Sequence, residues 1–213
     1  MSEFTAGKLS KILKEHERWC DTGGDEGEKA DLEGADLSEA NLECAILYRA
    51  NLIEANLRGA DLVGANLSEA ILEAADLVGA NLIGAILSQA DLSEADLRGA
   101  NLRDAFLPDA YLPEAYLRKA DLSGADLSDA FLSRADLNGA NLSEADLSGA
   151  DLSGTDLSDA NLRVAYLIGA DLSNANLSRA DLVGADLIGA VLIYANLSGA
   201  DLSNAYLYEA DLP

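Results

Sequence analysis

The sequence predicts an all-β solenoid with one α-helix at its N-terminal end, and the spacing of a few residue types leads to this fold class. Leucine occupies every fifth position from Leu32 to Leu212, and alanine lies two residues before it in every unit except that of Thr155. Asp or Asn stands between them in 27 of the 37 units. A helix would spread these leucines around its circumference, and a strand would alternate them between its faces. A chain that bends once every five residues instead places both Leu and Ala inside.

Residues 1–29 precede the repeat and predict an amphipathic capping helix followed by a linker. One apolar stripe recurs at helical spacing: Leu9, Ile12, Leu13, His16 and Trp19. Two glycines, Gly23 and Gly24, follow as a stop signal. The end of a β-solenoid exposes backbone groups and apolar side chains, so it needs a cover. We expect the helix to cap residues 30–213, with Trp19 over the first leucine layers.

The turn chemistry agrees with a bend in every unit. All 14 glycines of the repeat lie two residues after a leucine, and the three prolines, Pro108, Pro113 and Pro213, lie one residue after a leucine. A type II β-turn takes proline at its second position and glycine at its third, where φ is positive. Where Asp, Glu or Arg occupies that third position, we expect a different turn type, because positive φ is costly for these residues.

Units such as ADLSG, ANLSE and ADLRG resemble those of the pentapeptide repeat family, in a bacterial-type form, and the resemblance covers residues 30–213. It implies a right-handed quadrilateral β-helix with four pentapeptides, or 20 residues, in each coil. The repeat would then form about nine coils at the usual strand spacing, with residue n stacked on residue n+20.

Little in the sequence predicts catalysis. The inward positions hold only Leu, Ala and Thr155, so no ionisable group lies inside, and we expect the Thr155 hydroxyl to bond to nearby backbone. His16 is the only histidine, which excludes a Ser–His pair in the repeat, and Cys44 is interpreted as a surface thiol. Asp and Asn exchange freely before the leucine, which favours a structural role at the corners. We predict no catalytic residue, no cofactor and no metal site.

Ten units carry an apolar residue in place of Asp or Asn, and nine of them fall into two adjacent columns when counted modulo 20. Two hypotheses explain these columns: ladders that stabilise neighbouring coils, or a contact surface. The densest segment, AFLPDAYLPEAYL, and Phe131 of the next coil define a candidate interaction surface: Phe106, Pro108, Tyr111, Pro113, Tyr116 and Phe131.

The last coil is expected to expose an apolar floor of leucines with no second helix to cover it. A two-fold dimer that joins two C-terminal ends would cover this floor, because the same patch then meets itself. The candidate dimer interface consists of outward residues near this end: Val191, Ile193, Tyr194, Tyr206 and Tyr208.

The net charge of −24 excludes direct binding of nucleic acid or anionic membranes. The lack of an apolar leader and of paired cysteines predicts a cytoplasmic protein. We therefore expect a non-catalytic scaffold that binds an unknown protein partner. The alternative, implied by the resemblance to quinolone-resistance members, is an acidic DNA mimic that binds a type II topoisomerase (DNA gyrase). Those members have looped interruptions, more central phenylalanine and a dimerising extension, which this sequence lacks. A third class, a surface-active enzyme, would need an acid–base constellation that the sequence does not contain.

Overall fold

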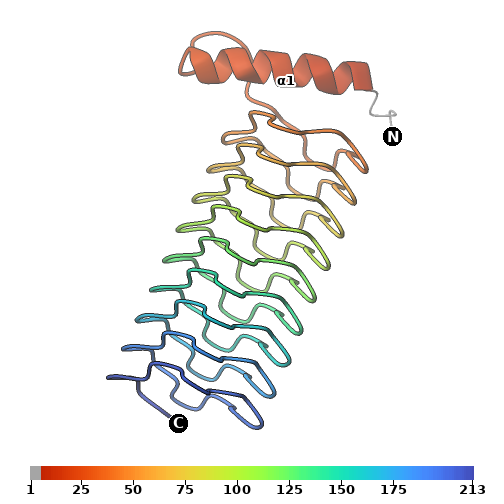
Figure 1. Ribbon diagram of the computed structural model, residues 1–213. Coiled ribbons are helices and arrows are strands. Elements are labelled where there is room, and N and C mark those ends of the chain that lie inside the picture. Colours follow the sequence, from red (N-terminus) through yellow and green to blue (C-terminus); the bar gives the residue numbers. More distant parts are fainter. Residues whose placement is uncertain (1–5) are drawn as a thin grey trace.

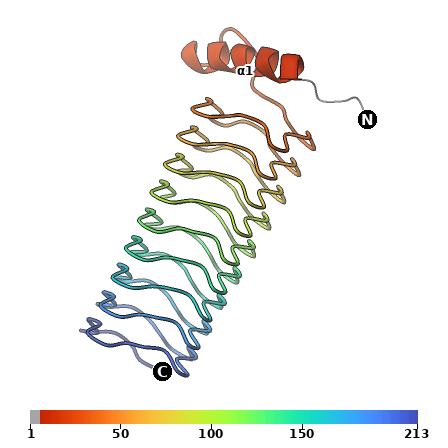
Figure 2. The same cartoon turned by 45° about the vertical axis from the view of Figure 1, so that its right-hand side comes forward.

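The computed structural model describes residues 6–213, so Met1–Thr5 of the predicted capping region lie outside the described residues. One helix, α1 (Ala6–Asp21), lies across one end of a solenoid that residues 30–213 form (Figure 1). The coils stack from α1 to the C-terminus along a straight axis, and the turned view shows the same stack (Figure 2). No helix in the described part of the chain has the length and apolar character needed to span a bilayer.

The coils are joined by parallel β-bridges between residues n and n+20, from Asp31↔Asn51 to Val191↔Asp211. Four five-residue units therefore complete one turn, as the resemblance to the pentapeptide repeat family implies. Each unit contributes a single bridging residue and no longer strand among the described residues, because the chain turns again within five residues. We number the four faces by the column of their outward centre: face 1 contains Asp31, face 2 Asp36, face 3 Asn41 and face 4 Ile46.

Three backbone hydrogen bonds per unit hold one coil to the next. In one example, the N–H of Leu92 donates to Tyr111 O at 2.7 Å and the N–H of Glu94 donates to Pro113 O at 3.1 Å. The N–H of Asp91 donates to Ala70 O, in the preceding coil, at 2.9 Å. The residue directly after each leucine uses only its carbonyl in this ladder. Proline fits there because it keeps the carbonyl and lacks only an N–H that the ladder does not use.

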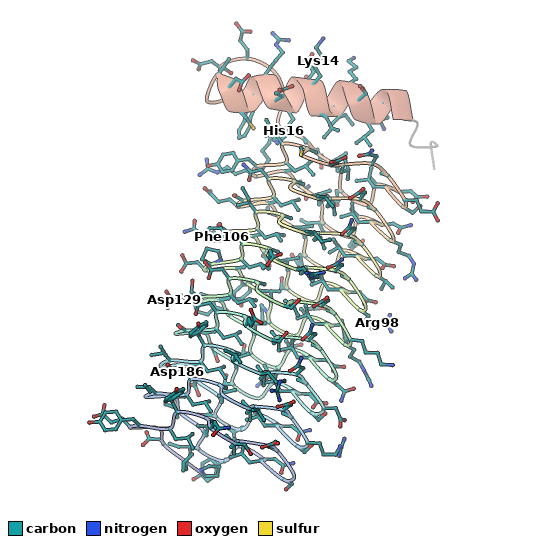
Figure 3. The ribbon with its side chains drawn as sticks, viewed as in Figure 1. Lys14, His16, Arg98, Phe106, Asp129 and Asp186 are labelled. Atoms are coloured by element: carbon teal, nitrogen blue, oxygen red, sulfur yellow. The ribbon has the colours of Figure 1, made fainter. Side chains whose placement is uncertain are left out.

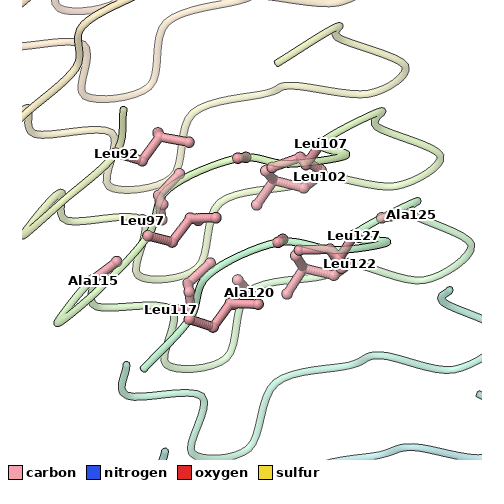
Figure 4. Packing of buried hydrophobic residues seen from close by; sticks show 14 of the residues in the cluster. Leu92, Leu97, Leu102, Leu107, Ala115, Leu117, Ala120, Leu122, Ala125 and Leu127 are labelled. Carbon is pink, nitrogen blue, oxygen red and sulfur yellow. The ribbon is translucent and has the colours of Figure 1, made fainter. Parts of the chain in front are cut away.

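The core consists of stacked leucine and alanine side chains. Leu92 through Leu192 and the alanines between them are at most 1% exposed, and Figure 4 shows successive layers, with Leu97 above Leu117 and Leu102 above Leu122. Each buried leucine contributes roughly 1.5–3 kcal/mol relative to an exposed one. The one polar inward side chain, Thr155, is 1% exposed, and its hydroxyl donates to Leu152 O at 2.7 Å, as predicted.

The expectation of a second turn type is wrong. Every residue two places after a leucine from Gly34 to Glu209 has positive φ, including 22 residues other than glycine, such as Val164 at 56°. The alanine that follows donates to the leucine carbonyl, for example from Ala165 to Leu162 at 3.1 Å, so all units make the same turn. The N–H at the positive-φ position bonds to the next coil. These bonds, repeated in register, outweigh the local preference of roughly 1–2 kcal/mol per residue.

The helix α1 rests on the first coil through Leu9, Ile12 and Leu13, which pack against the core. Trp19 does not cover the leucine layers as predicted; it stacks on His16 with ring centroids 5.6 Å apart. The N–H of Gly24 donates to Trp19 O at 2.8 Å, a bond that closes the helix in a Schellman motif. The predicted stop at the two glycines is therefore confirmed.

His16 links α1 to the first coil. It lies on the side of α1 that faces the solenoid, whereas Lys14 lies on the opposite side (Figure 3). The side chain is 0% exposed, and its Nδ1 accepts the N–H of Ala30 at 3.0 Å. Burial lowers the pKa of His16, while a hydrogen bond to the Tyr48 backbone acts in the opposite direction. The residue is a packed histidine and has no access to a substrate.

Candidate interaction surface

Asp and Asn at the outward centres hold the corners that follow them. Asp126 Oδ1 accepts the backbone N–H of Ser128 at 3.0 Å and its hydroxyl at 2.7 Å. Asn side chains also join neighbouring coils, as where Asn141 Nδ2 donates to Asp121 Oδ1 at 2.9 Å. Such bonds stabilise the charged form: hydrogen bonds from the Ser203 side chain and backbone lower the pKa of Asp201. The structural interpretation of these residues is confirmed, and they are poorly suited to acid–base chemistry.

Apolar side chains gather on faces 4 and 1 in the middle of the solenoid. Phe106 is bridged to Ile86 on face 4, and Tyr111 is bridged to Phe131 on face 1. The rings of Tyr111 and Phe131 are tilted, with centroids 6.0 Å apart. All four side chains are between 38% and 47% exposed, so solvent reaches a large part of each. With the two prolines at the neighbouring corners they form the aromatic patch: Ile86, Phe106, Pro108, Tyr111, Pro113 and Phe131.

The patch differs from the predicted surface at two positions. Tyr116 lies on face 2, beyond the corner at Pro113, where it bridges Asp96 and Asp136, so it does not share a face with the other rings. Ile86 belongs to the patch although the predicted surface did not include it. Its position 20 residues before Phe106 was the signal that could have included it.

Two units of the patch pair an aromatic residue with a proline two residues later, Phe106 with Pro108 and Tyr111 with Pro113. In a typical unit the N–H at the proline position donates to the Asp or Asn side chain. An aromatic residue in place of Asp or Asn removes the acceptor, and proline removes the N–H donor. Because both groups are removed together, no donor or acceptor is left unpaired. The two substitutions compensate each other within the unit, which lets a ring face solvent at little cost to the corner.

Charge is distributed unequally around the solenoid. Within residues 30–213, the units of faces 1 and 4 contain 17 acidic and 2 basic residues, and those of faces 2 and 3 contain 14 acidic and 7 basic residues. In Figure 3, Phe106, Asp129 and Asp186 of the face 4 units lie on one side of the solenoid, and Arg98 of face 2 lies on the other. The aromatic patch therefore lies on the more acidic half of the surface.

Arginines on faces 2 and 3 pair with the carboxylates of those faces. Arg98 donates to both oxygens of Asp96, at 2.8 and 2.5 Å. Although burial acts to raise it, these bonds hold the pKa of Asp96 below its usual range. Arg179 binds Asp159 in the same bidentate way, and its hydrogen bonds lower the pKa of Asp159. The two basic residues of faces 1 and 4, Arg49 and Arg134, each contact a single glutamate.

The C-terminal end of the solenoid is open. Leu212 is 53% exposed, and Tyr194, Tyr206 and Tyr208 are 62% to 81% exposed around it. In the last coil, the N–H groups of Leu197, Leu202 and Leu207 have no partner among the described residues. The same holds for the alanine carbonyls of that coil. This edge presents backbone donors, backbone acceptors and apolar area together.

A groove of about 780 Å³ lies between α1 and the first coil. Leu9 and Leu13 of α1 face Leu37 and Ile46 across it, and the exposed thiol of Cys44 stands at its edge. Nothing in the sequence indicated this groove, because it depends on how α1 crosses the first coil. No group of three His, Cys, Asp or Glu side chains in residues 6–213 is arranged to hold a metal ion.

A solenoid with a closed aliphatic core carries its distinctive chemistry on its outward positions. Its similarity to known proteins agrees with this class of repeat protein. The chain belongs to the pentapeptide repeat family: the family model "Pentapeptide repeats" matches in eight copies whose segments span residues 30–213. The protein thus has the right-handed quadrilateral β-helix of that family. No enzyme family is indicated. No curated protein matches the chain.

Two solved structures are similar along most of the chain. HetL, a pentapeptide repeat protein involved in heterocyst differentiation regulation from the cyanobacterium Nostoc sp. strain PCC 7120, is 36% identical. The match covers 98% of this chain and 94% of HetL, with a TM-score of 0.62. A trypsin-treated variant of QnrB1, a plasmid-mediated fluoroquinolone resistance protein, is 22% identical over 83% of this chain and 89% of QnrB1, with a TM-score of 0.66. The second likeness shows the fold alone.

Proposed function

We propose that this protein is a non-catalytic scaffold that binds a protein partner through the aromatic patch. The exposure of Ile86, Phe106, Tyr111 and Phe131 on two adjoining faces carries this proposal. None of the four belongs to the Leu–Ala core, and each of the three rings has an aspartate beside it in its column, Asp126, Asp91 or Asp151. Exposed apolar patches with a charged rim mark contact sites, and aromatic residues are enriched at interface centres. HetL, which is 36% identical, is involved in the regulation of heterocyst differentiation, a kind of role that a non-catalytic scaffold can fill.

An acidic DNA mimic that binds a type II topoisomerase, such as DNA gyrase, is the second candidate. The excess of acidic residues on faces 1 and 4 favours it. A mimic needs continuous columns of negative charge, like the phosphates that it replaces. In this protein Phe106 and Tyr111 interrupt the acidic columns at mid-length, so binding through the apolar side chains agrees better with the surface.

We assign the two ends of the molecule to capping and to self-association. Residues 1–29 act as a separate capping element for residues 30–213, with Leu9, Ile12 and Leu13 of α1 over the first coil. The two free cysteines, Cys20 and Cys44, fit a reducing compartment such as the cytoplasm.

The C-terminal ends of two copies form a two-fold dimer in this proposal. On either side of each outward centre in the last coil, an alanine carbonyl and a leucine N–H point toward the free end. This is the arrangement of a non-hydrogen-bonded pair in an antiparallel ladder. A two-fold axis brings each carbonyl opposite an N–H of the second copy and covers the apolar floor. The predicted interface residues surround this edge: Val191, Ile193, Tyr194, Tyr206 and Tyr208.

The binding role is tested by photo-crosslinking in cells of the source organism. p-Benzoyl-phenylalanine is introduced in place of Phe106, where it keeps a ring, and in place of Asn141 on face 3 as the matched control. We expect a crosslinked protein at position 106 and none at position 141. Crosslinks of equal yield at both positions, or none at position 106, would refute the proposed binding site.

A further inference from the structure

The centre of the aromatic patch is the exposed ring pair of Tyr111 and Phe131 on face 1. Their side chains are 47% and 46% exposed, and their rings are in contact with each other. No basic side chain stacks on either ring in the described structure, whereas Arg49 lies over the ring of Tyr48, 5.0 Å from its centroid. The two π faces are therefore available to a group from outside the chain.

Carboxylates surround this ring pair on all sides. In the face 1 column, Asp91 precedes Tyr111 and Asp151 follows Phe131. The corner shared with face 4 carries Asp109 and Asp129, and the opposite corner carries Glu94 and Glu114. Arg134 is the one basic residue at either corner, and its Nη1 lies 3.6 Å from Glu114 Oε1.

Most of these carboxylates have no cation of their own. Among residues 6–213, no ion pair involves Glu94, Asp109 or Asp129, whereas Asp76, Asp96 and Asp159 on the other faces each bind an arginine. Among the described residues, arginines thus pair with five of the 14 carboxylates of faces 2 and 3, and around the ring pair only Glu114 has an arginine partner.

We propose that the aromatic patch binds an arginine-rich segment of its protein partner. This inference rests on the proposed function and specifies the chemistry of the partner. A guanidinium group stacks on an aromatic ring and donates in parallel to a carboxylate, so one arginine uses both features of the site. Lysine presents a more strongly hydrated point charge without a planar face, so it fits less well. An acidic or neutral segment would leave the carboxylates buried without partners.

The probe is a fluorescein-labelled peptide of five Arg-Leu dipeptides, compared with Lys-Leu and Glu-Leu peptides of equal length. Its dissociation constant is measured by fluorescence anisotropy at near-physiological salt, where long-range attraction to net charge is screened. Tyr111→Ser/Phe131→Ser removes the rings, and Asp109→Asn/Asp129→Asn removes two carboxylates. The matched controls are Tyr166→Ser, which removes a ring of equal exposure outside the patch, and Asp121→Asn/Asp201→Asn on face 3.

We expect both patch variants to weaken binding of the Arg-Leu peptide about tenfold, because each loses contacts worth about 1.4 kcal/mol. Both controls should stay within about twofold of the wild type, the Lys-Leu peptide should bind more weakly, and the Glu-Leu peptide should not bind. Circular dichroism confirms that each variant is folded. Equal binding by patch variants and controls would show attraction by net charge alone and overturn the inference, as would no binding of the Arg-Leu peptide.

The crosslinked partner separates this inference from the function on which it rests. If the partner peptide attached at position 106 contains no arginine near the attachment point, the binding role stands and the arginine chemistry is wrong. If position 106 captures no partner, the binding role itself fails.

Discussion

At the scale of single residues, the hydrogen bonds between coils determine the backbone φ at the corners. The conformational preference of each residue type does not. Glu39, Arg49 and Val164 adopt the same positive φ as the glycines, because their N–H groups must reach the carbonyls of the next coil. The outward centres are less constrained. At these positions, the side chain of Asp or Asn accepts a backbone N–H at the following corner. An aromatic residue followed by proline needs no such bond, so these positions are free to vary with function.

Strain at the positive-φ position is measurable. We expect Val164→Gly to raise the free energy of unfolding by about 1 kcal/mol, since a β-branched side chain is least tolerated there. The matched reverse change, Gly84→Val, should lower it by a similar amount. A Cβ at Gly84 meets no atom within 4 Å, so only backbone strain acts. Urea unfolding followed by circular dichroism gives both values, and two unchanged midpoints would contradict this explanation of the turns.

At the scale of elements, α1 is held on the solenoid by the packing of Leu9, Ile12 and Leu13, and two further features, His16 and Gly27, fix its position. His16 must be neutral at Nδ1 to accept the N–H of Ala30. Gly27 lets the linker pass against the helix, because a Cβ there would lie 2.2 Å from Glu15 O and 2.7 Å from Trp19 N. The docking of α1 therefore depends on one imidazole and one glycine, whereas the coils are held by bonds that repeat in every unit.

This docking should weaken at acid pH. Burial lowers the pKa of His16 below its usual value near 6.5, so the stability it provides is present above that value. As the pH falls below 6.5, that stability decreases. The decrease ends once the pH is below the lowered pKa of His16 in the folded state. Lys29 opposes protonation, and burial raises the pKa of the Cys20 thiol, so the thiol stays protonated throughout.

The fluorescence of Trp19, the only tryptophan, reports this change because its ring stacks on His16. We expect one transition below pH 6.5 in the wild type and none in His16→Gln. A transition of the same midpoint in His16→Gln would assign it to another group.

The sequence predicted the periodic parts of the molecule and missed those that depend on one side chain meeting another. The spacing of leucines was enough for a bend in every unit, and the resemblance to the pentapeptide repeat family supplied four units per coil. Together they gave the n to n+20 register, the faces and the columns of Phe106 and Tyr111. The stacking of Trp19 on His16 and the groove beside α1 were not predictable, because no repeat determines how a helix crosses a coil. The positive φ at Val164 was missed since single-residue preferences omit the bonds to the next coil.

At the scale of the whole molecule, the solenoid has two unlike halves and two unlike ends. On faces 2 and 3, arginines such as Arg98 and Arg179 pair with five carboxylates among the described residues, whereas faces 1 and 4 have two such pairs for 17 acidic residues. One end is covered by α1, and the other exposes Leu212 and N–H groups that have no partner within residues 6–213. We assign partner binding to the half formed by faces 1 and 4, and self-association to the end that exposes Leu212.

The open end should join two copies of the chain. We expect light scattering at high protein concentration to give about twice the chain mass of 22.2 kDa, with a return to that mass on dilution. Tyr206→Glu/Tyr208→Glu should remove the dimer, because like charges would then meet across the two-fold axis. The matched control, Tyr111→Glu/Phe131→Glu, changes the same number of rings far from the end and should leave the dimer intact. A mass of 22.2 kDa at all concentrations refutes the C-terminal dimer.

If the proposed function is correct, the rings of the aromatic patch serve contact and do not hold the coils together. The free energy of unfolding of Phe106→Asn/Tyr111→Asn/Phe131→Asn tests this, because the variant installs a residue common at this position of the repeat. We predict a value within about 1 kcal/mol of the wild type. The N–H of Ser133 has no acceptor among residues 6–213, so the asparagine introduced at position 131 can accept it and offset the lost ring contact. A loss of about 3 kcal/mol or more would show that the rings are structural ladders and contradict the assignment of the patch to binding.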